Sequence, residues 1–148
     1  MNGSDVAPSN SPRLYIDANV FIYALEVESA EGNLARLWLS RVDRGDVPAL
    51  TSELTLLEVL PHPIAKRDDR LVDGYKRFLR DRDTLRVVPV TLDILYGGAD
   101  LRALHRSETP DAIHAATAQW GNCPAFLTND IRIRLPAGTV RRGLSDVG

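Results

Sequence analysis

The chain has a single cysteine, Cys123, among its 148 residues. One cysteine can form neither a disulfide framework nor a thiolate metal site within the chain. No apolar run approaches the roughly 20 residues that a helix needs to cross a bilayer. The first twelve residues, MNGSDVAPSNSP, lack the basic start and the apolar stretch of a secretory signal. We therefore expect a cytoplasmic protein with no membrane segment and with a flexible tail over residues 1–12.

Strong charge of either sign is also missing. The formal net charge is -2, which provides no global attraction to phosphate. Basic residues gather locally, in residues 66–70 and 76–83 and around the IRIR segment of residues 131–134. Such clusters can bind phosphates, but a charged run along a helix is more often a solvated face. Any contact with nucleic acid must therefore be local.

The amino-acid composition and the length of the chain are those of one compact domain. The composition is 44% hydrophobic and 26% charged, which is ordinary for a globular protein. A chain of this length buries roughly two-thirds of its unfolded surface without disulfides. We find no internal repeat and no second domain, and we expect a single domain over residues 13–148.

Short runs of β-branched and aromatic residues alternate along the chain with segments of helical apolar spacing. The predicted strands are residues 13–17, 47–51, 85–90 and 124–128, with a shorter fifth near 139–142. The predicted helices are residues 19–26, 30–44, 52–60, 68–82, 92–105 and 110–120. This alternation predicts a three-layer α/β/α fold around a parallel sheet of four to five strands.

Local signals concern three of the helices. Thr51 or Ser52 can cap the helix of residues 52–60, which should stop near the prolines of the segment PHP (61–63). The pair Gly97-Gly98 should strain the helix of residues 92–105 at its middle. Thr109, followed by a proline in the first turn, predicts the start of the last helix.

Four acidic residues stand at element boundaries, each within apolar sequence. They are Asp17 in LYIDANVFIYAL, Glu58 in TSELTLLEVL, Asp111 in TPDAIHAATA and Asp130 in FLTND. Parallel sheets bind ligands beyond the carboxyl ends of their strands, which is where Asp17 and Asp130 should lie. Two unit charges about 4 Å apart repel by roughly 4 kcal/mol at an effective dielectric near 20. A divalent cation is the simplest remedy for such a cluster.

Three of the acids also have ordinary structural explanations. Asp17 can cap the helix that follows it, although Asn19 can take that role instead. Asp111 is well placed for a negative charge in a first helical turn. Asp130 suits a turn, where Asn and Asp bond to their own backbone. Each of these explanations stays open when the residue is considered alone.

Glu58 is harder to explain structurally. A rotation of about 100° per residue places it on one helical arc with Leu54 and Leu57, which we expect to face the core. Burying an unpaired charge is costly, so a salt bridge with an arginine is the ordinary alternative. His114 lies one turn after Asp111 and can be a ligand or a donor to a ligand, although packing is the commoner role for such a residue.

In their order and surroundings, these motifs resemble the PIN domain, and specifically the small single-domain PIN ribonucleases that serve as VapC-type toxins. The resemblance covers residues 14 to about 142: YIDANVFIYAL resembles the opening Asp motif, TSELTLLEVL the Glu motif, TPDAIHAATA the third acid motif and LTND the last. It implies a metal-dependent endoribonuclease that hydrolyses RNA phosphodiester bonds with Mg²⁺ or Mn²⁺. It also implies an RNA substrate, a cognate antitoxin and a homodimer.

The same resemblance assigns roles to individual residues. The catalytic residues would be Asp17, Glu58, Asp111 and Asp130, with supporting polar groups at Asn19, Ser52 and Thr128. We expect Asp17, Asp111 and Asp130 to bind the metal. Glu58 would orient or deprotonate the attacking water.

Two other functions stay open at this level. A haloacid-dehalogenase-like phosphatase would use Asp17 as nucleophile and Thr51 or Ser52 as a phosphate donor. That chemistry usually wants a second acid two residues after the nucleophile, where this chain has Asn19. A non-catalytic PIN-like binding module is the other alternative, but degenerate sites normally lose acids and this chain retains all four.

Overall fold

A single parallel sheet organises the protein. The structure, a computed structural model, describes residues 12–147. Its five strands are β1 (Leu14–Ile16), β2 (Ala49–Ser52), β3 (Leu85–Val88), β4 (Ala125–Leu127) and β5 (Val140–Arg142). They pair in parallel in the order β3-β2-β1-β4-β5. The predicted parallel sheet of four to five strands is confirmed, with β1 at its centre.

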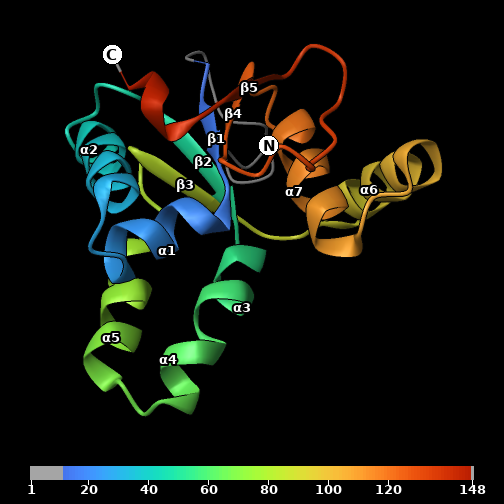
Figure 1. Ribbon diagram of the computed structural model, residues 1–148. Coiled ribbons are helices and arrows are strands. Elements are labelled where there is room, and N and C mark those ends of the chain that lie inside the picture. Colours follow the sequence, from blue (N-terminus) through green and yellow to red (C-terminus); the bar gives the residue numbers. More distant parts are fainter. Residues whose placement is uncertain (1–11, 148) are drawn as a thin grey trace.

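Helices connect the strands and cover the sheet. Within residues 12–147 they are α1 (Ala18–Glu26), α2 (Ala30–Asp43), α3 (Leu54–Val59), α4 (Pro61–Ala65), α5 (Asp69–Phe78), α6 (Leu92–His105), α7 (Thr109–Trp120) and the 3₁₀ turn η2 (Leu144–Asp146). Figure 1 shows α1 and α2 on one side of the sheet and α6 and α7 on the other. This arrangement confirms the predicted three-layer α/β/α fold.

The two faces of β1 supply two different cores. Leu14 and Ile16 pack on the side of α1, α2 and α5, in a cluster that also holds Trp38, Leu39 and Tyr75. Tyr15 points to the opposite side and joins the cluster that lies against α7. Side chains alternate along a strand, so a single three-residue strand serves both layers.

The segment between β2 and β3 differs from the prediction. The cap position of α3 is Glu53, and neither Thr51 nor Ser52 occupies it. The PHP segment does end α3, but Pro61 also starts the separate helix α4. Proline is tolerated in a first turn because the amide it lacks would be unpaired there. In Figure 1, α3, α4 and α5 extend beyond the sheet as a helical arm.

The predicted strain at Gly97-Gly98 is wrong, since α6 runs without interruption. A Cβ atom built on Gly98 would lie 3.6 Å from the carbonyl oxygen of Ala112 on α7. One built on Gly97 would lie 3.6 Å from the Cβ of Ala116. Small residues on both helices therefore let α6 pack closely against the helix that carries Asp111.

Two remaining expectations concern the N-terminal tail and the absence of a membrane-spanning helix. The predicted flexible tail over residues 1–12 falls, apart from Pro12, outside the described residues. None of the helices found between residues 12 and 147 is both long and apolar enough to cross a membrane.

Candidate active site

The loops that follow β1 and β4 form the centre of the site. These strands are parallel neighbours, so Asp17 after β1 and Asp130 after β4 lie at the same edge of the sheet. The charges also act on one another. Glu58 raises the pKa of Asp17, and both Asp130 and Glu58 raise the pKa of Asp111. Asp17 and Asp130 therefore share one sheet edge, and Glu58 and Asp111 lie near enough for their charges to interact with those of the other acids.

Asp17 is the most deeply placed of the four, with 5% of its surface exposed. Burial raises the pKa of this carboxyl above its ordinary value, and a hydrogen bond from Thr128 opposes the rise. Asp17 occupies the cap position of α1, but its side chain makes no capping bond. The alternative that Asn19 caps α1 is wrong, because α1 begins at Ala18 and places Asn19 in the first turn, exposed to solvent.

The other two supporting residues are buried and bonded. Thr128 donates its hydroxyl to Oδ2 of Asp17 over 2.7 Å and accepts the amide of Asp130 at 3.0 Å. Ser52, at the end of β2, accepts the amide of Leu54 at 3.0 Å. Thr128 therefore contacts the acids directly, whereas Ser52 holds the start of α3.

The environment of Glu58 corrects a prediction. Leu57 is 70% exposed, so the arc assigned to the core is open to solvent at that residue, and the Glu58 side chain itself is 32% exposed. The buried residues of α3 are Thr55 and Val59. This helix leaves the edge of the sheet and touches the core along one narrow line, which periodicity alone could not locate.

The partner of Glu58 is a histidine and not an arginine. Oε1 of Glu58 lies 2.5 Å from Nε2 of His114, and Nδ1 of the same ring lies 2.5 Å from the hydroxyl of Tyr15. His114 is 1% exposed and Tyr15 is fully buried. Of the roles left open for His114, hydrogen bonding to an acid is present beside packing. Nothing in the apolar run LYI pointed to Tyr15.

Asp111 lies in the first turn of α7, half-buried, and Glu108 takes the cap position predicted for Thr109. Burial raises the pKa of Asp111, and the charges of Asp130 and Glu108 raise it further. A helix N-terminus alone would favour the charged form and lower the pKa. Burial and repulsion from neighbouring acids therefore set the direction of the pKa shift at Asp111.

Asp130 is already engaged by an arginine. Arg132 donates Nε to Oδ1 at 3.0 Å, Nη2 to Oδ2 at 3.1 Å and its backbone amide to Oδ1 at 2.9 Å. These bonds lower the pKa of Asp130. The turn explanation of Asp130 is confirmed, because its side chain bonds the backbone two residues on. The D-x-R spacing was a local signal for this pair, although sequence analysis placed Arg132 only in a basic cluster.

The donor chemistry of the site fits a hard divalent cation. All four groups are carboxylates, and burial together with neighbouring acids disfavours the charged forms of Asp17 and Asp111. Among residues 12–147, however, no three His, Cys, Asp or Glu side chains are grouped as a ready-made metal cluster. Asp130 would also have to exchange Arg132 for a cation.

A cavity of about 210 Å³ adjoins the acids on one side. Asp111 lines it together with Arg106, Ser107, Arg132 and Arg134. The Ser107 hydroxyl is buried and has no hydrogen-bond partner within the described part of the chain. Arg106, Arg132 and Arg134 thus form a basic wall of this cavity beside Asp111, and the buried Ser107 hydroxyl lies within it.

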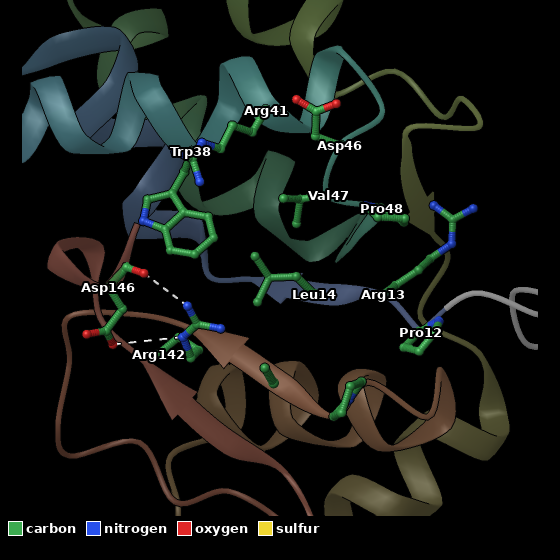
Figure 2. A pocket seen from close by; sticks show the side chains of 12 residues that line it. Pro12, Arg13, Leu14, Trp38, Arg41, Asp46, Val47, Pro48, Arg142 and Asp146 are labelled. Atoms are coloured by element: carbon green, nitrogen blue, oxygen red, sulfur yellow. Dashed lines mark hydrogen bonds and ion pairs between the residues drawn. The ribbon is translucent and has the colours of Figure 1, made fainter. Parts of the chain in front are cut away.

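A second cavity, of about 370 Å³, lies away from the acids. Figure 2 shows Arg13, Leu14 and Pro48 along it, where β1 and β2 begin, and Trp38 beside Arg142. Arg142 bonds to Asp146 and lies 5.5 Å from the centre of the Trp38 ring. None of the four acids lines this cavity, so it is separate from the candidate active site.

Comparison with known proteins identifies a family and a set of structures with a similar fold. A family model described as the PIN domain matches residues 14–138. No curated protein matches the chain. Among solved structures, a toxin-antitoxin complex from Klebsiella pneumoniae is 22% identical, with a TM-score of 0.64, and the match covers 86% of this chain and 95% of that one.

Two further structures are similar. FitAcB from Neisseria gonorrhoeae is 18% identical, with a TM-score of 0.69, covering 90% of this chain and 99% of the other. A VapC toxin from Mycobacterium tuberculosis, described as cleaving the sarcin-ricin loop, is 19% identical, with a TM-score of 0.62, covering 76% and 86% of the two chains. At these identities the likeness shows a shared fold.

Proposed function

Because the chain belongs to the PIN domain family, we propose that it is a metal-dependent endoribonuclease that hydrolyses RNA phosphodiester bonds. The observation that supports this proposal is that Asp17 and Asp130 lie at one edge of the sheet, with Glu58 and Asp111 near enough for their charges to interact with them. Hydrolysis of RNA needs a nucleophile made from water and compensation for charge on the phosphate and the leaving oxygen.

Three of the acids share one role in this proposal, and Glu58 has another. Asp17, Asp111 and Asp130 would hold Mg²⁺ or Mn²⁺, which when bound would supply charge compensation and make the attacking water more acidic. Thr128 keeps the carboxylate of Asp17 in place through its 2.7 Å hydrogen bond. Glu58, held by a histidine and not by an arginine, would orient the water and accept its proton.

The basic wall beside Asp111 provides a place for the RNA backbone. Arginines bind phosphate oxygens through paired N–H groups, and an acidic centre repels RNA unless such groups lie nearby. Arg106 and Arg134 would supply these contacts. We expect Arg134→Gln to raise KM for RNA and to reduce the salt dependence of binding by a slope of about 1, because one phosphate contact is lost.

The proposed biological role is the toxin of a toxin-antitoxin pair that acts in the cytoplasm. It is supported by the sequence resemblance and by the similarity to a toxin-antitoxin complex and to a toxin that cleaves the sarcin-ricin loop. A cognate antitoxin and a homodimer belong to the same proposal. Light scattering of the purified protein tests the dimer, and co-purification with the product of an adjacent reading frame tests the antitoxin.

The direct test is RNA cleavage by the purified protein. Structured and unstructured RNAs are incubated with Mg²⁺, Mn²⁺ or a chelator, beside the Asp17→Asn and Asp111→Asn variants. We expect cleavage with either metal, none with chelator, and a loss of at least about 100-fold in either variant. Cleavage that persists in chelator would refute the metal-dependent mechanism.

The two alternative functions are not favoured. The Thr51 hydroxyl is buried, donates to the carbonyl of Ile16 over 2.8 Å and bonds to Thr55 at 2.9 Å, so it cannot also bind a phosphate. A phosphatase would therefore lack this donor. A non-catalytic module has no need for four acids at one edge, and their retention favours an enzyme.

A further inference from the structure

His114 is a polar side chain that is almost completely buried. It is 1% exposed and lies on α7 among small buried residues, mostly alanine. A buried imidazole brings two polar nitrogens out of water, which is costly unless both are hydrogen-bonded. Both are bonded in this structure, one to Tyr15 and the other to Glu58. An apolar side chain would fill the same space without this requirement.

Tyr15, the partner of Nδ1 of His114, packs between two rings. The Tyr15 ring stacks on Phe126 with 4.7 Å between centroids and meets the His114 ring edge-on at 5.8 Å. The Tyr15 side chain is fully buried, and its phenolic hydroxyl carries a proton that it can donate. It can therefore donate to Nδ1 of His114 over 2.5 Å.

This donation decides which ring nitrogen carries a proton. In a neutral imidazole one nitrogen donates and the other accepts, so an Nδ1 that accepts from Tyr15 leaves the proton on Nε2. Nε2–H then donates to Oε1 of Glu58 over 2.5 Å. The three residues form one directed chain of hydrogen bonds, from β1 through α7 to α3.

The chain ends on a carboxylate that has no other anchor. Within residues 12–147, His114 is the only hydrogen-bond partner of the Glu58 side chain, and the adjacent Leu57 is 70% exposed. An unrestrained glutamate samples many rotamers, and fixing it costs conformational entropy. Only Oε1 is bonded to His114, so Oε2 is left for another group. The charge of Glu58 already acts on Asp17 and Asp111.

We infer that His114 is a positioning residue that fixes the carboxylate of Glu58 toward Asp17 and Asp111, and that the hydroxyl of Tyr15 sets the tautomer in which it does so. This inference rests on the proposed function for its catalytic consequence. Asp111 and His114 are three residues apart on α7, so one helix supplies an acid and also the group that orients another. Neither His114 nor Tyr15 contacts the reacting atoms in this proposal.

Kinetics with RNA test the consequence. We expect His114→Ala to lower kcat about 10- to 100-fold, the usual effect of removing an orienting partner, with KM changed by less than about twofold. Tyr15→Phe keeps the ring and removes the hydroxyl, and it should lower kcat less. In a Glu58→Gln background, His114→Ala should have no further effect on kcat. His62→Ala, an exposed histidine on α4, is the control and should match the wild type.

A purely structural role would give a different pattern. His114→Ala would then lower kcat by the same factor with Glu58 or with Gln at position 58, and that result would overturn the inference. Thermal melting of every variant accompanies the kinetics. If His114→Ala does not fold, His114→Gln, which retains a donor, replaces it in the same cycle and should keep more activity than the alanine variant.

Nitrogen NMR of the histidine ring tests the geometry without RNA. In ¹⁵N-labelled wild-type protein near pH 7.5, His114 should carry its proton on Nε2 and accept at Nδ1. Tyr15→Phe should move the Nδ1 signal, and Glu58→Gln should move the Nε2 signal. A proton on Nδ1, or signals that neither variant moves, would refute the inference. The predicted spectrum from a protein that cleaves no RNA would refute the proposed function and leave the positioning intact.

Discussion

Thr128 donates its hydroxyl to Oδ2 of Asp17 over 2.7 Å, although 111 positions separate the two residues. The same hydroxyl accepts the amide of Asp130. One buried side chain thus joins the loop after β1 to the loop after β4, and with them two of the four acids. The hydrogen bond also opposes the rise in the pKa of Asp17 that burial causes.

Replacing Thr128 tests this link. Thr128→Val keeps the shape and removes the hydroxyl, which leaves a buried carboxylate oxygen and the Asp130 amide without their partner. We expect a loss of about 1–3 kcal/mol in the free energy of unfolding and a clear fall in kcat. Thr117→Val is the matched control, because Thr117 is also buried but bonds only the carbonyl of Ile113 on its own helix. Equal cleavage by both variants would contradict the assigned role.

The substitution Asp17→Asn should abolish RNA cleavage but raise the stability of the folded protein. The folded-state pKa of Asp17 is raised, so the folded protein holds its proton more tightly than the unfolded chain does. Its charged form therefore destabilises the fold at neutral pH, and this cost disappears as the pH falls below the unfolded value near 3.8. We expect the variant to melt at a higher temperature than the wild type at pH 7, with the difference shrinking toward pH 4. A lower melting temperature at pH 7 would contradict this.

A bound metal ion should stabilise the wild type, because it would compensate the buried negative charge of the acids. A cation that binds only the folded state raises the melting temperature, and one present at 100 times its Kd adds about 2.7 kcal/mol. We expect Mn²⁺ to raise the melting temperature of the wild type, a chelator to reverse it, and Asp111→Asn to abolish most of the shift. An equal shift in wild type and variant would place the metal elsewhere.

The affinity for Mn²⁺ should depend on pH. Burial and neighbouring acids raise the pKa values of Asp17 and Asp111, so these ligands take up protons at a higher pH than ordinary carboxylates. Because protons and metal compete, affinity measured by calorimetry should begin to fall with decreasing pH above 3.8, the ordinary value. Affinity that is constant down to pH 4 would show that neither residue is a ligand.

Arg132 should compete with metal for Asp130. Its guanidinium and backbone amide engage both carboxylate oxygens, and they lower the pKa of Asp130. Arg132→Gln should return that pKa toward its usual range and tighten Mn²⁺ binding roughly two- to fivefold in the absence of RNA, the modest change expected for an exposed ion pair. Arg134→Gln, two residues along, is the control and should leave Mn²⁺ affinity unchanged. Weaker Mn²⁺ binding by Arg132→Gln would mean that Arg132 supports the ligand and does not block it.

Local pattern was sufficient for some features and not for others. Strand and helix order followed from apolar periodicity, and the position of Asp17 after a strand followed from the same pattern. Periodicity failed at Glu58, because it assigns a face to a helix without saying what that face meets. Leu57 is apolar and 70% exposed, so an apolar neighbour was no evidence of burial. The expected burial of the Glu58 arc was therefore wrong as a reason to single out this residue. Its hydrogen bond with His114 is the evidence that now supports a role for Glu58 at the site.

Arg132 and His114 show two different kinds of missed signal. The Arg132 pair is local, two residues from Asp130, and turn chemistry could have revealed it. The His114 pair joins residues 56 apart in the chain. No local pattern could have shown whether this histidine packs, binds metal or donates to an acid.

The amino-acid sequence by itself determined the order of the elements, the parallel sheet and the edge at which the four acids would meet. Local apolar spacing chooses strand or helix, and parallel crossovers bring the carboxyl ends of all strands to one side. Only the tertiary structure decided the partners, Thr128 for Asp17 and His114 for Glu58. Hydrogen bonds form only within a few tenths of an ångström of their optimal length, and side chains from distant elements reach that distance only when the whole domain has packed.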